Sequence, residues 1–151
     1  MDDTQSVLKW SLLAGAGYFL LVAGAHLLGI KTPFLYVYYD LPSNAYQDKI
    51  ISFTSFGWAM FFVAGYSSVK RGSLRSVRYI VMAAAGAVGG LCLINLCTDF
   101  RDYSPKAQVP VYWLETFVLG VFLGWLAFLY TLTKQTAGQS KTYLAPPPSS
   151  Q

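Results

Sequence analysis

The chain has 151 residues, of which 54% are hydrophobic and only 12% are charged, and its mean hydropathy is +0.41. A typical soluble domain carries about 25% charged residues, so this composition excludes an ordinary soluble protein and favours a membrane protein. The net charge of +4 does not indicate a nucleic-acid surface, because no run of Lys and Arg is interleaved with stacking aromatic residues. We therefore expect this protein to lie in a lipid bilayer and not to bind nucleic acid.

Four long apolar segments carry most of the chain, at residues 10–30, 50–69, 79–98 and 111–132. Each is close to the ~20 residues that an α-helix needs to cross ~30 Å of hydrocarbon. Because lipid offers the backbone no hydrogen-bond partners, each segment is expected to be helical. The sequence predicts an all-α integral membrane protein, with residues 1–133 forming a four-transmembrane-helix bundle with short loops.

The first apolar segment allows one alternative interpretation. Ala23-Gly24-Ala25 has the small-x-small pattern of a signal-peptidase site. However, Asp2 and Asp3 make the preceding region acidic, and the apolar run continues to Ile30. A retained first span is therefore the preferred interpretation.

The orientation follows from the basic residues beside the spans, which are retained on the cytoplasmic side. Seven lie at the N-terminus, in the middle connection and in the C-terminal tail: Lys9, Lys70, Arg71, Arg75, Arg78, Lys134 and Lys141. Four lie in the first and third connections: Lys31, Lys49, Arg101 and Lys106. We therefore expect both termini on the cytoplasmic side, or on the stromal or matrix side in an organelle.

The C-terminal segment 134–151 is rich in Gln, Ser, Thr and Gly and ends in Ala145-Pro146-Pro147-Pro148. Such a composition cannot bury a core. The sequence predicts a disordered tail on the cytoplasmic side.

The first connection is crowded with aromatic residues, and an apolar ring with a polar edge suits the membrane interface. We interpret Phe34-Leu35-Tyr36-Val37-Tyr38-Tyr39 as an interfacial segment that lies over the mouth of the bundle. Pro42 then turns the chain, and Ser43 or Asn44 can cap a helix that follows. An early start of the second helix would place Asp48 in its first turns, where a carboxylate is favourable.

Small residues at helical spacing predict close helix contacts. Gly86 and Gly90 form a GxxxG pattern in the third span, and Gly120 and Gly124 form another in the fourth. Such stripes let helix backbones approach closely. We expect the third and fourth spans to cross tightly within the bundle, with a homo-oligomer interface as the alternative.

Polar side chains from all four spans occur at a similar depth, near the extracytoplasmic end. Asn95 and Asp99 share a helix face, and Glu115 lies about one turn inside the fourth span. An ionised carboxylate at that depth needs a partner, for which His26, Arg101 and Lys49 are candidates. The candidate ligand-binding residues are His26, Asp48, Ser52, Asn95, Asp99 and Glu115.

Four interpretations of this polar layer remain open. It can be a structural hydrogen-bonded plug, a metal or haem site built on His26, or a relay for ions or protons. It can also orient the head group of a lipid, quinone or sterol-like amphiphile above an apolar cavity. In that case we expect aromatic residues of the second and fourth spans to line the cavity: Phe53, Phe56, Phe61 and Phe117.

The sequence contains no CxxC, HExxH, Walker, GxSxG or GxGxxG motif, so it names no cofactor and favours a protein that is not an enzyme. Cys92 and Cys97 point about 140° apart on one helix and are expected to be free thiols. We predict a small membrane protein that binds an amphiphile near the extracytoplasmic end of its bundle. The alternative is an accessory or assembly subunit of a larger membrane complex.

Overall fold

The computed structural model describes the backbone of residues 3–143 and the side chains of residues 3–136. Its elements are α1 (Asp3–Leu28), α2 (Ala45–Lys70), α3 (Arg75–Cys97), the short 3-10 helix η1 (Phe100–Asp102) and α4 (Val109–Tyr143). All four α-helices are long and apolar enough to cross a membrane. The predicted all-α four-helix membrane fold is confirmed, and the chain is a multi-pass membrane protein.

The ends of the first connection are set by local hydrogen bonds. At the end of α1, Gly29 adopts a φ of 66°, and the Ile30 amide donates to the Ala25 carbonyl at 2.8 Å. This left-handed C-terminal cap favours glycine. At the start of α2, the Asn44 side chain accepts from the Gln47 amide, completing a capping box. The predicted cap at Asn44 is therefore confirmed.

The last helix is longer than the sequence indicated. The tail was expected to lack structure from residue 134, but α4 continues to Tyr143. Lys, Gln and Ala are good helix formers and extend a helix that has already formed. The tail prediction is therefore wrong as far as Tyr143, and its last part, 144–151, lies outside the described residues.

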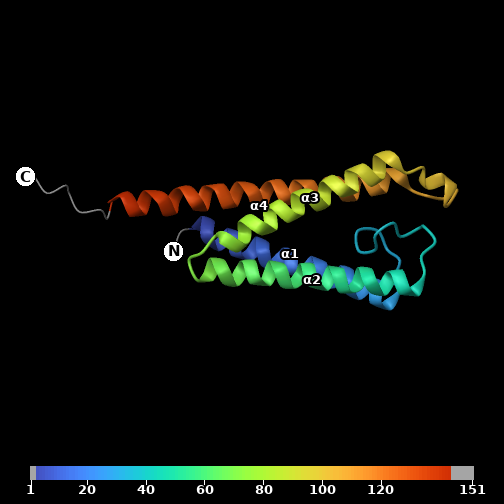
Figure 1. Ribbon diagram of the computed structural model, residues 1–151, viewed down its shortest axis with the longest axis horizontal. Coiled ribbons are helices and arrows are strands. Elements are labelled where there is room, and N and C mark those ends of the chain that lie inside the picture. Colours follow the sequence, from blue (N-terminus) through green and yellow to red (C-terminus); the bar gives the residue numbers. More distant parts are fainter. Residues whose placement is uncertain (1–2, 144–151) are drawn as a thin grey trace, which may run out of the picture.

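The four helices form two hairpins, α1 with α2 and α3 with α4 (Figure 1). The N-terminus and the connection 71–74 lie at one end of the molecule, which we call the basic end. The connections 29–44 and 98–108 lie at the other, which we call the loop end. The hairpins are joined at the basic end and diverge toward the loop end.

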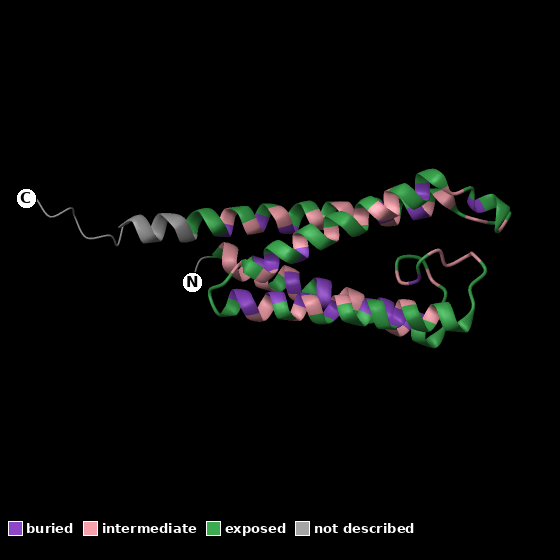
Figure 2. Ribbon diagram, in the orientation of Figure 1, coloured by how far each residue is buried: buried purple, intermediate pink, exposed green. Residues whose placement is uncertain are grey.

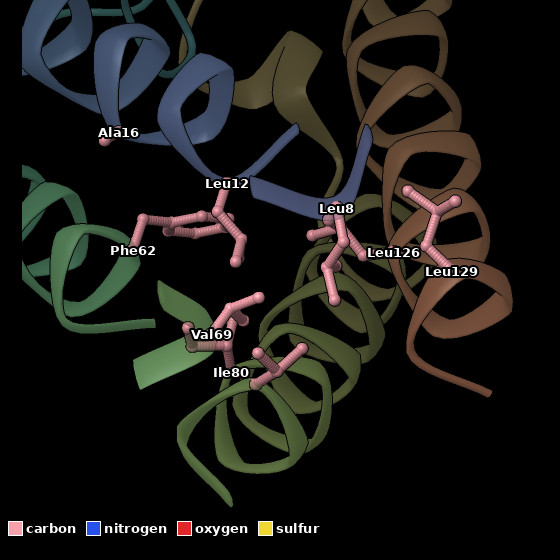
Figure 3. Close-up of a cluster of buried hydrophobic side chains, with 9 residues drawn as sticks. Leu8, Leu12, Ala16, Phe62, Val69, Ile80, Leu126 and Leu129 are labelled. Carbon is pink, nitrogen blue, oxygen red and sulfur yellow. The ribbon is translucent and has the colours of Figure 1, made fainter. Parts of the chain in front are cut away.

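The apolar core is concentrated at the basic end, where all four helices contribute side chains (Figure 3). Its members are Leu8, Leu12, Ala16, Phe62, Val69, Val77, Ile80, Leu126 and Leu129. The Trp125 indole donates to Ser11 Oγ at 3.0 Å, which ties α4 to α1 beside this core. Buried positions are frequent along α1 and α2, whereas those of α3 are Val77, Ile80 and Asn95 (Figure 2).

The close helix contacts occur at glycines other than those predicted. A Cβ atom added at Gly15 would lie 2.5 Å from the Phe62 ring, and one at Gly65 would meet the end of Ile80. At Gly86 and Gly90 it would meet nothing within 4 Å. The predicted contact through Gly86 and Gly90 is therefore wrong: beyond the basic end α3 inclines away from α2 toward α4, but these two glycines do not face α4.

The topology can be tested by labelling single cysteines, in a background in which Cys92 and Cys97 are replaced. We expect Ser73→Cys, in the connection at the basic end, to react with a membrane-impermeant maleimide from the cytoplasmic side only. Ser104→Cys, at the loop end, should react from the opposite side. Labelling of both positions from the same side would contradict the four-span topology.

The packing of α1 against α2 can be tested with two leucine substitutions on α1, one at a close contact and one at an open position. Gly15→Leu should lower the free energy of unfolding by about 1–3 kcal/mol, because the new side chain overlaps the Phe62 ring. Gly17→Leu, where a Cβ meets nothing within 4 Å, should be nearly neutral. Denaturant titration in detergent measures both, and equal effects would show that α1 and α2 do not pack as described.

Candidate functional site

A cavity of about 430 Å³ lies between the two hairpins, in the space that their divergence leaves toward the loop end. Its walls are almost entirely apolar and come from all four helices and from the first connection. Along α4 the lining residues run from Tyr112 to Leu126, which corresponds to roughly 20 Å at the rise of a helix. The cavity is therefore long and narrow relative to its volume.

The aromatic residues that line the cavity differ from those predicted. Phe53, Phe56 and Phe117 are all at least half exposed, so they face the surroundings of the bundle, and Phe61 is not among the lining residues. The phenylalanines of the wall are Phe19, Phe34, Phe62 and Phe122. The position of a residue along a span gives its depth in the membrane, but it does not show whether its side chain faces the cavity or the lipid.

The small residues of α3 form part of the cavity wall. Ala84, Ala87 and Gly90 line it, together with Val88 and Leu91. Short side chains here leave space unfilled, so part of the predicted α3 stripe borders the cavity instead of a helix contact. The stripe signal was present in the sequence, but its role was misassigned.

The connection between α1 and α2 forms the wall of the cavity at the loop end, with five consecutive residues, Phe34–Tyr38, lining it. Two of them, Phe34 and Tyr38, have φ angles of 67° and 53°. Positive φ costs about 1–2 kcal/mol for a residue with a Cβ atom, so such a conformation persists only where its surroundings hold it. The predicted interfacial segment is thus a folded-in part of the site.

His26 and Asp48 form the first group that holds this segment. The Val37 amide donates to His26 Nε2 at 3.1 Å, which places the imidazole proton on Nδ1. That atom is buried and lies 3.6 Å from Asp48 Oδ1. The Tyr36 ring stacks on His26 at 3.9 Å between centroids, and its hydroxyl donates to Asp48. Ser43 Oγ lies 2.9 Å from the Tyr36 hydroxyl oxygen.

Asn95 forms a second group that holds the segment. Its amide nitrogen donates to Thr116 Oγ1 at 2.9 Å, linking α3 to α4. Its carbonyl oxygen accepts from the Tyr38 hydroxyl at 3.3 Å. The Tyr38 ring also packs edge-on against Tyr112. Burial, with the charge of Glu115 as the smaller cause, raises the pKa of Tyr38 to about 12, so the hydroxyl remains a donor at neutral pH.

Glu115 is the only one of the six predicted site residues that lines the cavity. One of its oxygens accepts from the Phe34 amide at 2.8 Å, and the Phe34 carbonyl accepts from the Tyr18 hydroxyl at 2.8 Å. The predicted partners of this carboxylate, His26, Arg101 and Lys49, are not within 4.0 Å of it among the residues that the structure describes. A backbone amide of the connection takes their place.

The remaining two predicted site residues lie apart from the cavity. Ser52 donates from Oγ to the Ala23 carbonyl at 2.8 Å and so joins α2 to α1. Asp99 accepts from the Arg101 amide at 3.0 Å and caps η1. The predicted grouping of Glu115 with His26 and Asp99 is therefore not seen: Glu115 and His26 accept from the separate amides of Phe34 and Val37 in the first connection, and Asp99 bonds within its own turn.

Sequence reasoning missed the tyrosines Tyr18, Tyr36, Tyr38 and Tyr112 and the carboxylate Asp40 as parts of this region. Asp40 accepts from the Tyr112 hydroxyl and from the Gln108 amide, so it joins the first connection to the start of α4. The density of aromatic residues in the first connection was the available signal. It was assigned to the interface, and not to the site.

A second cavity of about 260 Å³ adjoins the first near Glu115. Tyr18, Phe34 and Glu115 line both cavities, together with Leu119 and Phe122. The bonded trio of Tyr18, Phe34 and Glu115 therefore borders both cavities. Within residues 3–136, no three His, Cys, Asp or Glu side chains are grouped closely enough to hold a metal ion.

Comparison of this chain with protein-family models, with curated proteins and with solved structures found no match. The geometry of the site is therefore the basis for its function.

The group around His26 can be tested by a double-mutant cycle. His26→Ala and Asp48→Ala should each destabilise the protein by about 1–3 kcal/mol, because each leaves buried polar groups without partners. The double variant should be less destabilised than the sum of the two by about 1 kcal/mol, since the residues share one group. Denaturant titration in detergent measures the cycle.

The pair His26→Ala and Asp99→Ala serves as the control for this cycle, because Asp99 bonds only within its own turn. Their effects should add within about 0.5 kcal/mol. Coupling between His26 and Asp99, with additivity between His26 and Asp48, would contradict the group described here and support the grouping of His26 with Asp99 that the sequence suggested.

Proposed function

We propose that this protein binds a small single-chain amphiphile in the larger cavity. The head group lies at the loop end beside Glu115, and the chain extends along α4 toward Leu126. The observation that carries this proposal is the change of polarity along one elongated cavity. Its lining contains Glu115, Thr116 and tyrosines near the start of α4, and Phe122, Leu123 and Leu126 further along it.

The size of the cavity supports a ligand of this class. Sites for small molecules occupy about 300–1,000 Å³ and have mostly apolar walls with a few polar groups that fix orientation. The present cavity, at 430 Å³, lies at the lower end of this range. Its length along α4 favours a chain-like ligand over a compact one.

The exposure of the lining residues supports entry from the bilayer. On α1 and α4 the lining residues are buried or half-buried, whereas Thr54 of α2 and Ala87 and Ile94 of α3 are exposed. The cavity therefore opens sideways between α2 and α3. An amphiphile dissolved in the membrane can reach it by lateral movement, without leaving the hydrocarbon.

His26, Asp48 and Asn95 contribute to this function as positioning residues. They do not line the cavity, but they bond to Tyr36, Val37 and Tyr38, which do. Directional hydrogen bonds to His26 Nε2, Asp48 and Asn95 fix the position of these wall residues. The predicted polar layer thus supports a binding site instead of forming it directly.

The proposal can be tested by filling the cavity. Ala87→Phe places a ring in the cavity and should remove a co-purifying amphiphile, detected by mass spectrometry of a solvent extract. Ala85→Phe is the matched control, because Ala85 lies on the same helix, is exposed and does not line the cavity. Its extract should match that of the unmodified protein.

Equal extracts from the two phenylalanine variants would contradict binding in this cavity. Stoichiometric co-purification of another membrane protein with all variants, and no bound amphiphile in any of them, would favour the accessory-subunit alternative.

A further inference from the structure

The carboxylate in the cavity wall has no positively charged partner. None of the bases at the loop end, which are Lys31, Lys49, Arg101 and Lys106, lies within 4.0 Å of a Glu115 oxygen in the described part of the chain. The only bond to Glu115 among these residues comes from the Phe34 amide, which reaches one of its two oxygens. A carboxylate inside the hydrocarbon region is costly unless it is paired.

Aromatic rings surround the same end of the cavity. The lining residues there include Tyr18, Phe34, Tyr38 and Tyr112, contributed by α1, the first connection and α4. Tyr36 also lines this end, but its ring stacks on His26 and has Lys31 Nζ above it. The faces of aromatic rings carry negative electrostatic potential and attract cations, and rings grouped around one space recognise quaternary ammonium groups. A carboxylate among several rings is therefore suited to an organic cation.

A second carboxylate adds negative charge to this end of the site. Asp40 accepts from the hydroxyl of Tyr112, which lines the cavity, and from the Gln108 amide. Both of its donors are neutral groups, so neither cancels its charge. The nearby base Lys31 lies over the Tyr36 ring, with its Nζ 5.6 Å from the ring centroid, and donates to the Leu41 carbonyl at 3.2 Å. In the described part of the chain it is not within 4.0 Å of either carboxylate.

We infer that the head group bound beside Glu115 is a cation, such as an amine or a quaternary ammonium group. This inference rests on the proposed amphiphile site and specifies its ligand class. The cation pairs with the free side of the Glu115 carboxylate and lies against the tyrosine rings, while its chain occupies the apolar part of the cavity. The ligand then supplies the counter-charge that the described residues do not provide within 4.0 Å of Glu115.

The experiment compares two probes with the same alkyl chain, bromine-labelled dodecyltrimethylammonium and bromine-labelled dodecanol. Bromine quenches nearby tryptophan, and Trp58 is the one tryptophan among the residues that line the cavity. Binding is followed as quenching that is lost in Trp58→Phe. The whole protein is used in a maltoside detergent, whose head group is uncharged.

We expect the ammonium probe to bind about tenfold more tightly than the alcohol probe. Glu115→Gln should abolish this preference, because the amide still accepts from Phe34 but carries no charge. Asp99→Asn is the matched control, since it removes a carboxylate at the same end of the molecule but outside the cavity. It should leave the preference unchanged.

The outcomes separate this inference from the proposed function. Equal binding of the two probes, or a preference that survives in Glu115→Gln, would overturn the cationic head group and leave amphiphile binding intact. Loss of the preference in Asp99→Asn would assign it to surface charge and would also overturn the inference. If neither probe quenches Trp58, both the inference and the proposed function fail.

Discussion

The architecture depends on where four apolar helices can pack together. Contact among all four is confined to the basic end, where Leu12, Phe62 and Ile80 interlock and Gly15 and Gly65 allow close approach. Within a bilayer such packing is a main source of attraction between helices, because lipid tails are as apolar as the side chains. Beyond this core the hairpins diverge, and the cavity between them is the direct result.

The divergence creates a second requirement, which the first connection meets. An open mouth would expose polar groups of α1, α3 and α4 to an apolar space, at a considerable cost for each group without a partner. The folded-in segment provides the Val37 amide for His26, the Phe34 amide for Glu115 and the Tyr38 hydroxyl for Asn95. The cavity wall at the loop end and the polar layer are therefore one structure, which the first connection forms together with α1, α3 and α4.

The helices could be predicted from the sequence because hydropathy and length alone determine them in a membrane, and the Asn44 cap has a local signature. The site could be predicted only in part. Depth correctly placed His26 and Glu115 near one end, but their partners belong to a connection whose path depends on tertiary contacts. The GxxxG spacing at Gly86 likewise permits close packing without requiring it, and the inclination of α3 is not a local property.

The positive φ angles of Phe34 and Tyr38 have a consequence for how the molecule assembles. Local sequence does not favour this backbone, and the contacts that hold it come from Tyr18 of α1, Asn95 of α3 and Glu115 of α4. The contacts from Asn95 and Glu115 exist only once both hairpins are in place. The first connection is made early in the chain, yet the contacts that hold its conformation are complete only when the fourth helix has joined the bundle.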